Sequence, residues 1–115
     1  MKLLVVVLNK TECLERLLAS FTKNKIPGAT IIDSRGMAQE LDQSEELDFM
    51  LSLRTLIHPA HQENKTIFMA VADDMVPKIS RIVNEVTGGF DKPDTGILFT
   101  VPIDYIEGLR GQKNA

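Results

Sequence analysis

Two strand–helix–strand patterns follow one another along the chain, with a long segment between them. In the first pattern, a continuous apolar, β-branched run at residues 3–9 predicts a strand. Apolar residues spaced by three and four then predict an amphipathic helix over residues 11–24, which Thr11 can cap. A Pro-Gly turn leads from this helix into a second predicted strand at residues 29–36.

The second pattern begins with a predicted strand at residues 65–73. Asp73 or Asp74 can cap the helix that follows, because a short carboxylate accepts hydrogen bonds from the first amides of a helix. Gly88 and Gly89 end the helical spacing, as glycine does at many helix C-termini.

A fourth strand is predicted over residues 96–108, where Pro102 lacks an amide donor and therefore indicates an edge strand or a bulge. The order of elements predicts an α+β, ferredoxin-like sandwich: an antiparallel four-stranded sheet with two helices on one face. Residues 36–65 form a long insertion between the second and third strands. The 115 residues suit one such domain, spanning 1–115.

The predicted strands are apolar on both faces. In the first strand, Leu3, Val5 and Val7 share one face, and the residues between them share the other. Helices on one side of the sheet cover only one of these faces. We therefore expect the second face to be buried against other subunits.

Composition limits the partners and the compartment. The net charge is −3 and the sequence has no strongly basic segment, so nucleic acid is not an expected partner. The single cysteine, Cys13, gives no disulfide framework and fits a reducing compartment. The N-terminal apolar run is too short for a signal peptide or a membrane span, so a cytoplasmic location is expected.

The insertion is long, and loops of more than about 12 to 15 residues inside a compact domain are usually functional or partly disordered. Residues 38–48 are acidic with little to bury, and we expect them to be mobile without a ligand. Residues 49–57 have apolar spacing that suits a short amphipathic helix, but alternation also allows a strand. Periodicity does not choose between the two.

Five motifs, in this order, resemble those of the nitrogen-regulatory PII proteins and their PII-like relatives. They are the first strand, the G-A-T-I entry to the second strand at 28–31, the R-G junction at 35–36, A-V-A-D at 70–73, and T-G followed by a loop and G-I-L-F at 87–99. In that family, trimers bind adenine nucleotides, and often 2-oxoglutarate, between subunits. The long T-loop docks on a target such as a transporter or an enzyme. The resemblance implies a trimeric signalling protein rather than an enzyme.

The family's phosphate-binding pattern is only partly present. Gly96 matches the second glycine of the family's G-D-G-K loop, but Asp94 stands at the first glycine and Ile97 at the lysine. Of the two arginines in the family's last strand, Arg110 matches one and Gly108 stands at the other. The resemblance therefore implies weaker binding of triphosphates, or a less charged effector, since polyphosphate sites depend on several cations.

The predicted ligand contacts combine matched positions with nearby cations and loop glycines. They are Thr30, Arg35, Gly36, Gly88, Gly89, Lys92, Gly96 and Arg110. The effector they imply is an adenine nucleotide or another small anion. The segment at 88–96 also suits a plain structural bend, since Pro-Asp-Thr-Gly is a good turn sequence.

Two other functions remain open. A metal-tolerance protein resembling the CutA family would bind a divalent metal at His58, His61 or Cys13, although solvated loop histidines and a packed cysteine are the commoner explanation. A small acylphosphatase-like enzyme would need an arginine in the first loop, which here reads N-K-T-E at residues 9–12. Metal ligands and catalytic residues are therefore not assigned.

Overall fold

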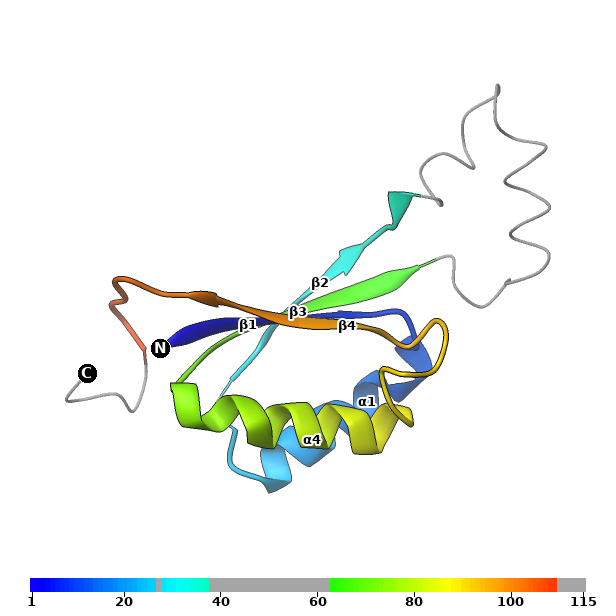
Figure 1. Cartoon of the computed structure of the whole chain (residues 1–115), viewed down its shortest axis with the longest axis horizontal. Coiled ribbons are helices and arrows are strands. Elements are labelled where there is room, and N and C mark those ends of the chain that lie inside the picture. The colour runs from blue at the N-terminus through cyan, green and yellow to red at the C-terminus, as the bar shows by residue number, and fades with distance from the viewer. Residues whose placement is uncertain (27, 38–62, 110–115) are drawn as a thin grey trace.

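The computed structural model describes residues 1–26, 28–37 and 63–109. The four strands are β1 (Lys2–Leu8), β2 (Thr30–Ser34), β3 (Asn64–Val71) and β4 (Gly96–Pro102). The two helices are α1 (Leu14–Lys23) and α4 (Val76–Thr87), each entered through a single 3-10 turn, η1 (Thr11–Cys13) and η3 (Asp73–Met75). The strands form one antiparallel sheet in the order β2-β3-β1-β4, and both helices cover the same face (Figure 1). The predicted ferredoxin-like fold is confirmed.

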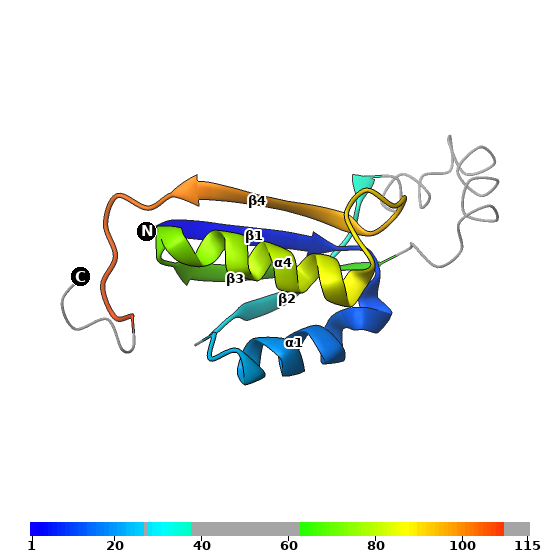
Figure 2. The same cartoon turned by 60° about the horizontal axis from the view of Figure 1, so that its bottom comes forward.

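The core lies between this covered face of the sheet and the two helices, which run side by side in front of the strands in Figure 2. The strands contribute Leu4, Val6, Leu8, Ile67, Met69 and Val71, and the helices contribute Leu17, Phe21, Ile79, Ile82 and Val83. The alternation predicted for β1 is confirmed, because every second residue from Leu4 to Leu8 is fully buried. Each of these side chains contributes about 1.5 to 3 kcal/mol through burial.

The opposite face of the sheet, here called the open face, is also apolar. Register places Phe68, Val5 and Phe99 in one row across β3, β1 and β4. The next row contains Val7 and Ile97. Phe99 is 44% exposed and Ile97 is 58% exposed, so large apolar side chains reach solvent. Several large apolar side chains exposed on one face often mark an interaction surface.

The predicted side-chain caps of both helices are wrong. Thr11 lies inside the 3-10 turn that precedes α1, and Lys10 before it makes no side-chain cap bond. Ala72 occupies the corresponding position before the second 3-10 turn, and Asp73 instead pairs with the N-terminal amine at 2.9 Å. The 3-10 turns move the start of each helix beyond the residues that were expected to cap it. Asp74 likewise belongs to a 3-10 turn.

The last strand is shorter than predicted. It ends at Pro102 rather than continuing to residue 108, and the next amide, that of Ile103, donates to the Met1 carbonyl oxygen at 3.2 Å. Pro102 lies on an edge strand, as predicted, because β4 is the outermost strand next to β1. Pro77 lies in the first turn of α4, where its missing amide breaks no helical hydrogen bond.

We expect the ion pair between Asp73 and the N-terminal amine to make a pH-dependent contribution to the free energy of unfolding. The hydrogen bond from the N-terminal amine lowers the pKa of Asp73. Since the pKa is lower in the folded than in the unfolded protein, the pair stabilises at pH values above the unfolded pKa of about 3.9 and is lost as the pH falls. Urea unfolding of wild type and Asp73→Asn should differ at pH 7 and converge near about pH 2 to 3. Equal midpoints at pH 7 would contradict this role.

The predictions for residues 38–62 lie outside the described residues. These are the mobile acidic segment, the alternative helix or strand at 49–57, and the two histidines, His58 and His61. Within the described part of the chain, no helix is long and apolar enough to cross a membrane.

Candidate ligand-binding site

The α4–β4 loop begins with the glycine pair that was predicted to end the helix. Gly88 has a φ of +93° and donates its amide to the Asn84 carbonyl oxygen at 3.0 Å, which closes the last turn of α4. Gly89 follows at a φ of +116°. Both values lie in the left-handed region that favours glycine. The expected helix C-cap is confirmed.

Two side chains of α4 hold the first residues of this loop. The Asn84 Oδ1 atom accepts the amide of Phe90 at 3.0 Å, and the Thr87 hydroxyl accepts the amide of Gly89 at 3.4 Å. The amides of Gly88, Gly89 and Phe90 are therefore used inside the loop. The predicted role of the two glycines as ligand contacts stays a prediction. Because their amides already donate within the chain, a ligand would have to be held by side chains or by other amides.

Gly96 is required by the packing of two strands. It has a φ of +137°, and a Cβ atom at this position would collide with the Val7 carbonyl oxygen and lie 3.2 Å from the Leu8 Cα atom. The close approach of β1 and β4 thus explains this glycine without any ligand. Its predicted role in binding an anion is not needed to account for it.

The loop after β1 joins the α4–β4 loop to form one unit. The amides of Asn9 and Lys10 both donate to the Thr95 carbonyl oxygen, at 3.1 and 3.3 Å. The Lys10 ammonium donates to the Thr87 carbonyl oxygen at 2.9 Å, where a cation is favoured by the helix dipole. The amides of Asn9 and Lys10 therefore bind the protein's own backbone.

A pocket of about 370 Å³ opens beside this unit. Its polar lining includes Asn9, Lys92, Asp94 and Thr95, and its apolar lining includes Val7, Phe90 and Ile97. Two of the predicted ligand contacts, Lys92 and Gly96, therefore line the same pocket. The buried Thr95 hydroxyl has no hydrogen-bond partner among the described residues.

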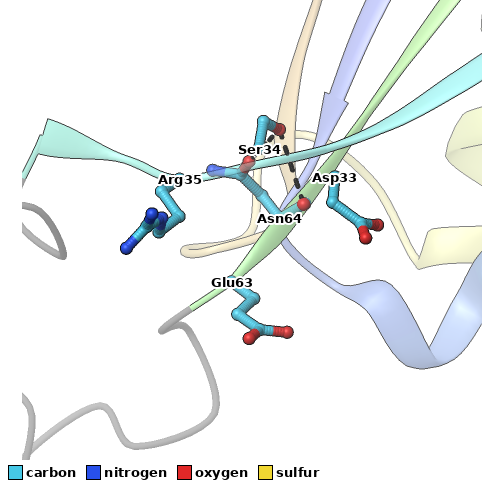
Figure 3. A pocket seen from close by; sticks show the side chains of 5 residues that line it. All are labelled: Asp33, Ser34, Arg35, Glu63 and Asn64. Carbon is cyan, nitrogen blue, oxygen red and sulfur yellow. Dashed lines mark hydrogen bonds between the residues drawn. The ribbon is translucent and has the colours of Figure 1, made fainter.

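A second, polar pocket lies where β2 and β3 lead into the insertion (Figure 3). It is lined by Asp33, Ser34, Arg35, Glu63 and Asn64 and has a volume of about 420 Å³. The Ser34 hydroxyl hydrogen-bonds the side chain of Asn64. Arg35 and Glu63 point away from this hydrogen-bonded pair.

One ion pair and two hydroxyl contacts hold β2 and β3 together at this pocket. The Lys65 ammonium hydrogen-bonds the Asp33 carboxylate, and this bond raises the pKa of Lys65. The Ser34 and Thr66 hydroxyl oxygens lie 2.7 Å apart. Packing does not require a glycine at position 36, since an added Cβ atom would lie 3.8 Å from Asn64 Nδ2, an ordinary contact distance.

The predicted contacts thus fall into separate places within the chain. Gly88, Gly89, Lys92 and Gly96 belong to the α4–β4 loop, and Arg35 and Gly36 belong to the base of the insertion. Thr30 lines a third pocket, of about 390 Å³, together with Phe68 and Leu109. Arg110 lies outside the described residues.

A metal site has no support in the described part of the chain, where no three potential ligands from His, Cys, Asp and Glu come together. Cys13 is buried and its sulfur accepts a hydrogen bond from Arg16 at 3.2 Å. It is therefore a packed residue, as the commoner explanation of the sequence suggested. The CutA-like alternative would rest on His58 and His61, which the structure does not describe.

Sequence reasoning missed three residues of the α4–β4 unit. Lys10 and Asn84 make hydrogen bonds that hold the two loops, and the Thr95 hydroxyl is buried without a partner among the described residues. Lys10 and Thr95 are in contact although more than 80 residues separate them in the sequence. No local pattern indicates such a contact. Asn84 near the end of a helix that stops at glycine is the one signal that could have been noticed, since asparagine often bonds nearby backbone amides.

Comparison with known proteins does not assign a family or a function to this chain. No protein-family model matches the chain, and no curated protein matches it significantly.

Proposed function

We propose that the protein is a PII-like trimeric signalling protein that binds a small anionic ligand, such as an adenine nucleotide, between subunits. In this proposal it regulates a partner, such as a transporter or an enzyme, through the insertion at 36–65. The observation that carries the proposal is that the two groups of predicted contacts lie at one end of the sheet but at its opposite edges.

Register defines this separation. Asp33, Lys65, Leu8 and Gly96 form one row across β2, β3, β1 and β4. Three strand spacings of about 4.8 Å separate the outer members, so the two edges are about 14 Å apart. The α4–β4 loop and the open end of the β2–β3 pair lie at the same end of the molecule in Figures 1 and 2. A ligand would have to span about this distance to contact both groups within a subunit.

A closed ring of subunits would join the two edges. In a head-to-tail ring, the β4 edge of one subunit faces the β2 edge of the next, and every subunit makes the same contact. The open face supports this arrangement, because Phe99 and Ile97 would be removed from water around the ring axis. The number three comes from the resemblance to PII-like proteins.

Lys92 and Arg35 are the cations that such a contact would bring to one ligand. They line the pockets at the β4 and β2 edges respectively. Asp94 and Glu63 line the same two pockets and reduce the positive charge. The combined site favours an anion of low charge over a triphosphate, since charge-assisted contacts to several cations would be needed to hold four negative charges.

Sedimentation equilibrium tests the assembly. We expect about three times the subunit mass of 12.8 kDa at micromolar concentration. A thermal-shift screen of adenine nucleotides, 2-oxo acids and divalent metals should then show stabilisation by an anion, about 2.7 kcal/mol at 100 times its Kd. A monomer that no anion stabilises would refute the proposal, and stabilisation only by a divalent metal would favour the metal-binding alternative.

Subunit mixing tests whether the site lies between subunits. Arg35→Gln and Lys92→Gln should each weaken binding of the anion found in the screen. When the two variants are co-assembled, about one quarter of the interfaces combine an intact Lys92 with an intact Arg35, so part of the high-affinity binding should return. Lys78→Gln, on the helix face, is the control that should bind normally. No recovery in the mixture would place the two residues outside a shared site.

A further inference from the structure

We propose that β4 of one subunit pairs with β2 of the next as an antiparallel strand, so that the sheet continues from one subunit to its neighbour. The pairing places Ile97 of one copy opposite Ile32 of the other. This inference rests on the proposed function, in which the two edges face each other in a ring. It adds the segment that occupies each edge and the register in which the two strands meet.

The two outer strands of the sheet are the first observation. Among the described residues, β2 and β4 each have a partner strand on one side only. Alternate backbone groups on the other side of such a strand can bind an added strand. Within the chain, β1 and β2 both run antiparallel to β3, and β4 runs antiparallel to β1. In a ring whose axis is parallel to the strands, β4 therefore also meets the β2 strand of the next copy in the antiparallel direction.

The β2 strand exposes apolar side chains on both of its faces, which is the second observation. Ile32 belongs to the open face and is 47% exposed. Ile31 belongs to the face that the helices cover, where its cross-strand neighbour Ile67 is fully buried, yet Ile31 is still 36% exposed. The helices therefore do not cover this edge of the sheet. An adjoining sheet with its own helices would cover both side chains.

The edge of β4 has a hollow on each face near its first residues. The pocket of about 370 Å³ includes Ile97 of the open face. A second hollow, of about 320 Å³, reaches Ser80 of α4 and Leu98, which packs against the core on the helix side. Adjacent residues of a strand point to opposite faces, so Ile31 and Ile32 of an added strand would enter one hollow each.

The symmetry of a closed ring sets the register. Such a ring is a pure rotation, so a row of residues that crosses one subunit continues at the same level in the next. The row that begins at Ile32 on β2 ends at Ile97 on β4. Farther along the same pairing, Arg35 of the neighbour lies beside the segment that contains Asp94 and Lys92. Opposite charges then meet at Arg35 and Asp94, which favours this register, and both proposed ligand cations lie at one end of the ladder.

The width of the sheet also suits a ring of three. Four strand spacings give each side of a triangle a length of about 19 Å, and its centre then lies about 5.5 Å from each sheet. Packed sheets lie about 10 Å apart, so the side chains of one sheet fill about half of that distance. Side chains of the open face would therefore meet at the axis. Four such sheets in a square would leave a gap, because the centre lies about 10 Å from each sheet.

Disulfide crosslinking of a double variant, Ile32→Cys with Ile97→Cys, tests the pairing on the full chain. Within one chain, three strand spacings of about 14 Å in total separate these positions, whereas a disulfide requires Cα atoms within about 7 Å. A link can therefore form only between copies. Mild oxidation should join the chains into a covalent trimer on a non-reducing gel. Cys13 is buried and should not compete.

Ile32→Cys with Val101→Cys is the matched control. Val101 is 44% exposed on the same face of β4, but it lies about 14 Å farther along the strand than Ile97. We expect about tenfold less covalent trimer from this variant after the same oxidation time. Equal yields from the two double variants would show that the links arise from random collisions, and would overturn the inference.

Sedimentation equilibrium of the wild type separates this inference from the proposed function. If the wild type is assembled but the Ile32–Ile97 pair does not crosslink, the strand pairing is wrong and the proposed function stands. If the pair crosslinks in an assembly of another size, or in one that no anion stabilises, the strand pairing stands and the proposed function fails.

Discussion

Replacing Gly96 by alanine should destabilise the protein by about 3 kcal/mol or more. Two costs add at this position. The φ of +137° is strained for any residue with a Cβ atom, and the added methyl group would collide with the Val7 carbonyl oxygen of the neighbouring strand. The strands β1 and β4 would have to separate at their first pair. Urea unfolding followed by circular dichroism measures the change.

Gly28→Ala is the matched control for this prediction. A Cβ atom at Gly28 would meet no atom within 4 Å, and its φ is not in the left-handed region. We expect this variant to stay within about 0.5 kcal/mol of wild type. A Gly96→Ala variant that is equally stable would mean that β4 can move away from β1 at little cost, which would reopen the loop as a flexible binding element.

Placing a charge on the open face should dissociate the proposed oligomer. Phe99 lies in the row that crosses β3, β1 and β4, and Phe99→Asp would put a carboxylate where an apolar contact between subunits is expected. An unpaired charge in a buried interface costs at least about 2 kcal/mol for each contact, which is more than a tenfold loss of affinity. Sedimentation equilibrium should show monomers, and their circular dichroism should remain that of a folded protein.

Tyr105→Asp is the control for the open-face variant. It also replaces an exposed aromatic residue by aspartate, but Tyr105 follows the end of β4 and does not belong to the rows of the sheet. This variant should keep the wild-type mass. If Phe99→Asp also keeps the wild-type mass, the open face is not the contact between subunits.

The fold could be predicted from the sequence because its signals are local. The continuous apolar run of β1, the apolar stripe of α4 and the stop at Gly88 each depend on residues a few positions apart. The ends of elements were less predictable. Thr11 and Asp73 have the chemistry of caps, but the 3-10 turns that precede the helices depend on how the chain leaves each strand. Propensity does not contain that information.

The candidate site could be predicted only in part, for the same reason. Lys92 and Gly96 were predicted because they lie in a recognisable loop, and both line one pocket in the structure. Their roles in binding stay predictions. Lys10 and Thr95 were not found, since the contact between their loops joins the two ends of the chain. The distance between Arg35 and the α4–β4 loop could not be predicted before the order of the strands was known.

The pairing of Ser34 with Asn64 has a consequence for how this chain can diversify. The two residues are cross-strand neighbours and their side chains are hydrogen-bonded, so the segment between them starts and ends at one fastened point. The entropy of closing a loop grows only slowly with its length, by about 0.6 kcal/mol for each doubling. Mutation, shortening or extension of this segment therefore leaves the sheet almost unaffected. Evolution can therefore change the insertion while the folding of the domain stays the same, and a foreign recognition sequence could be grafted there by design.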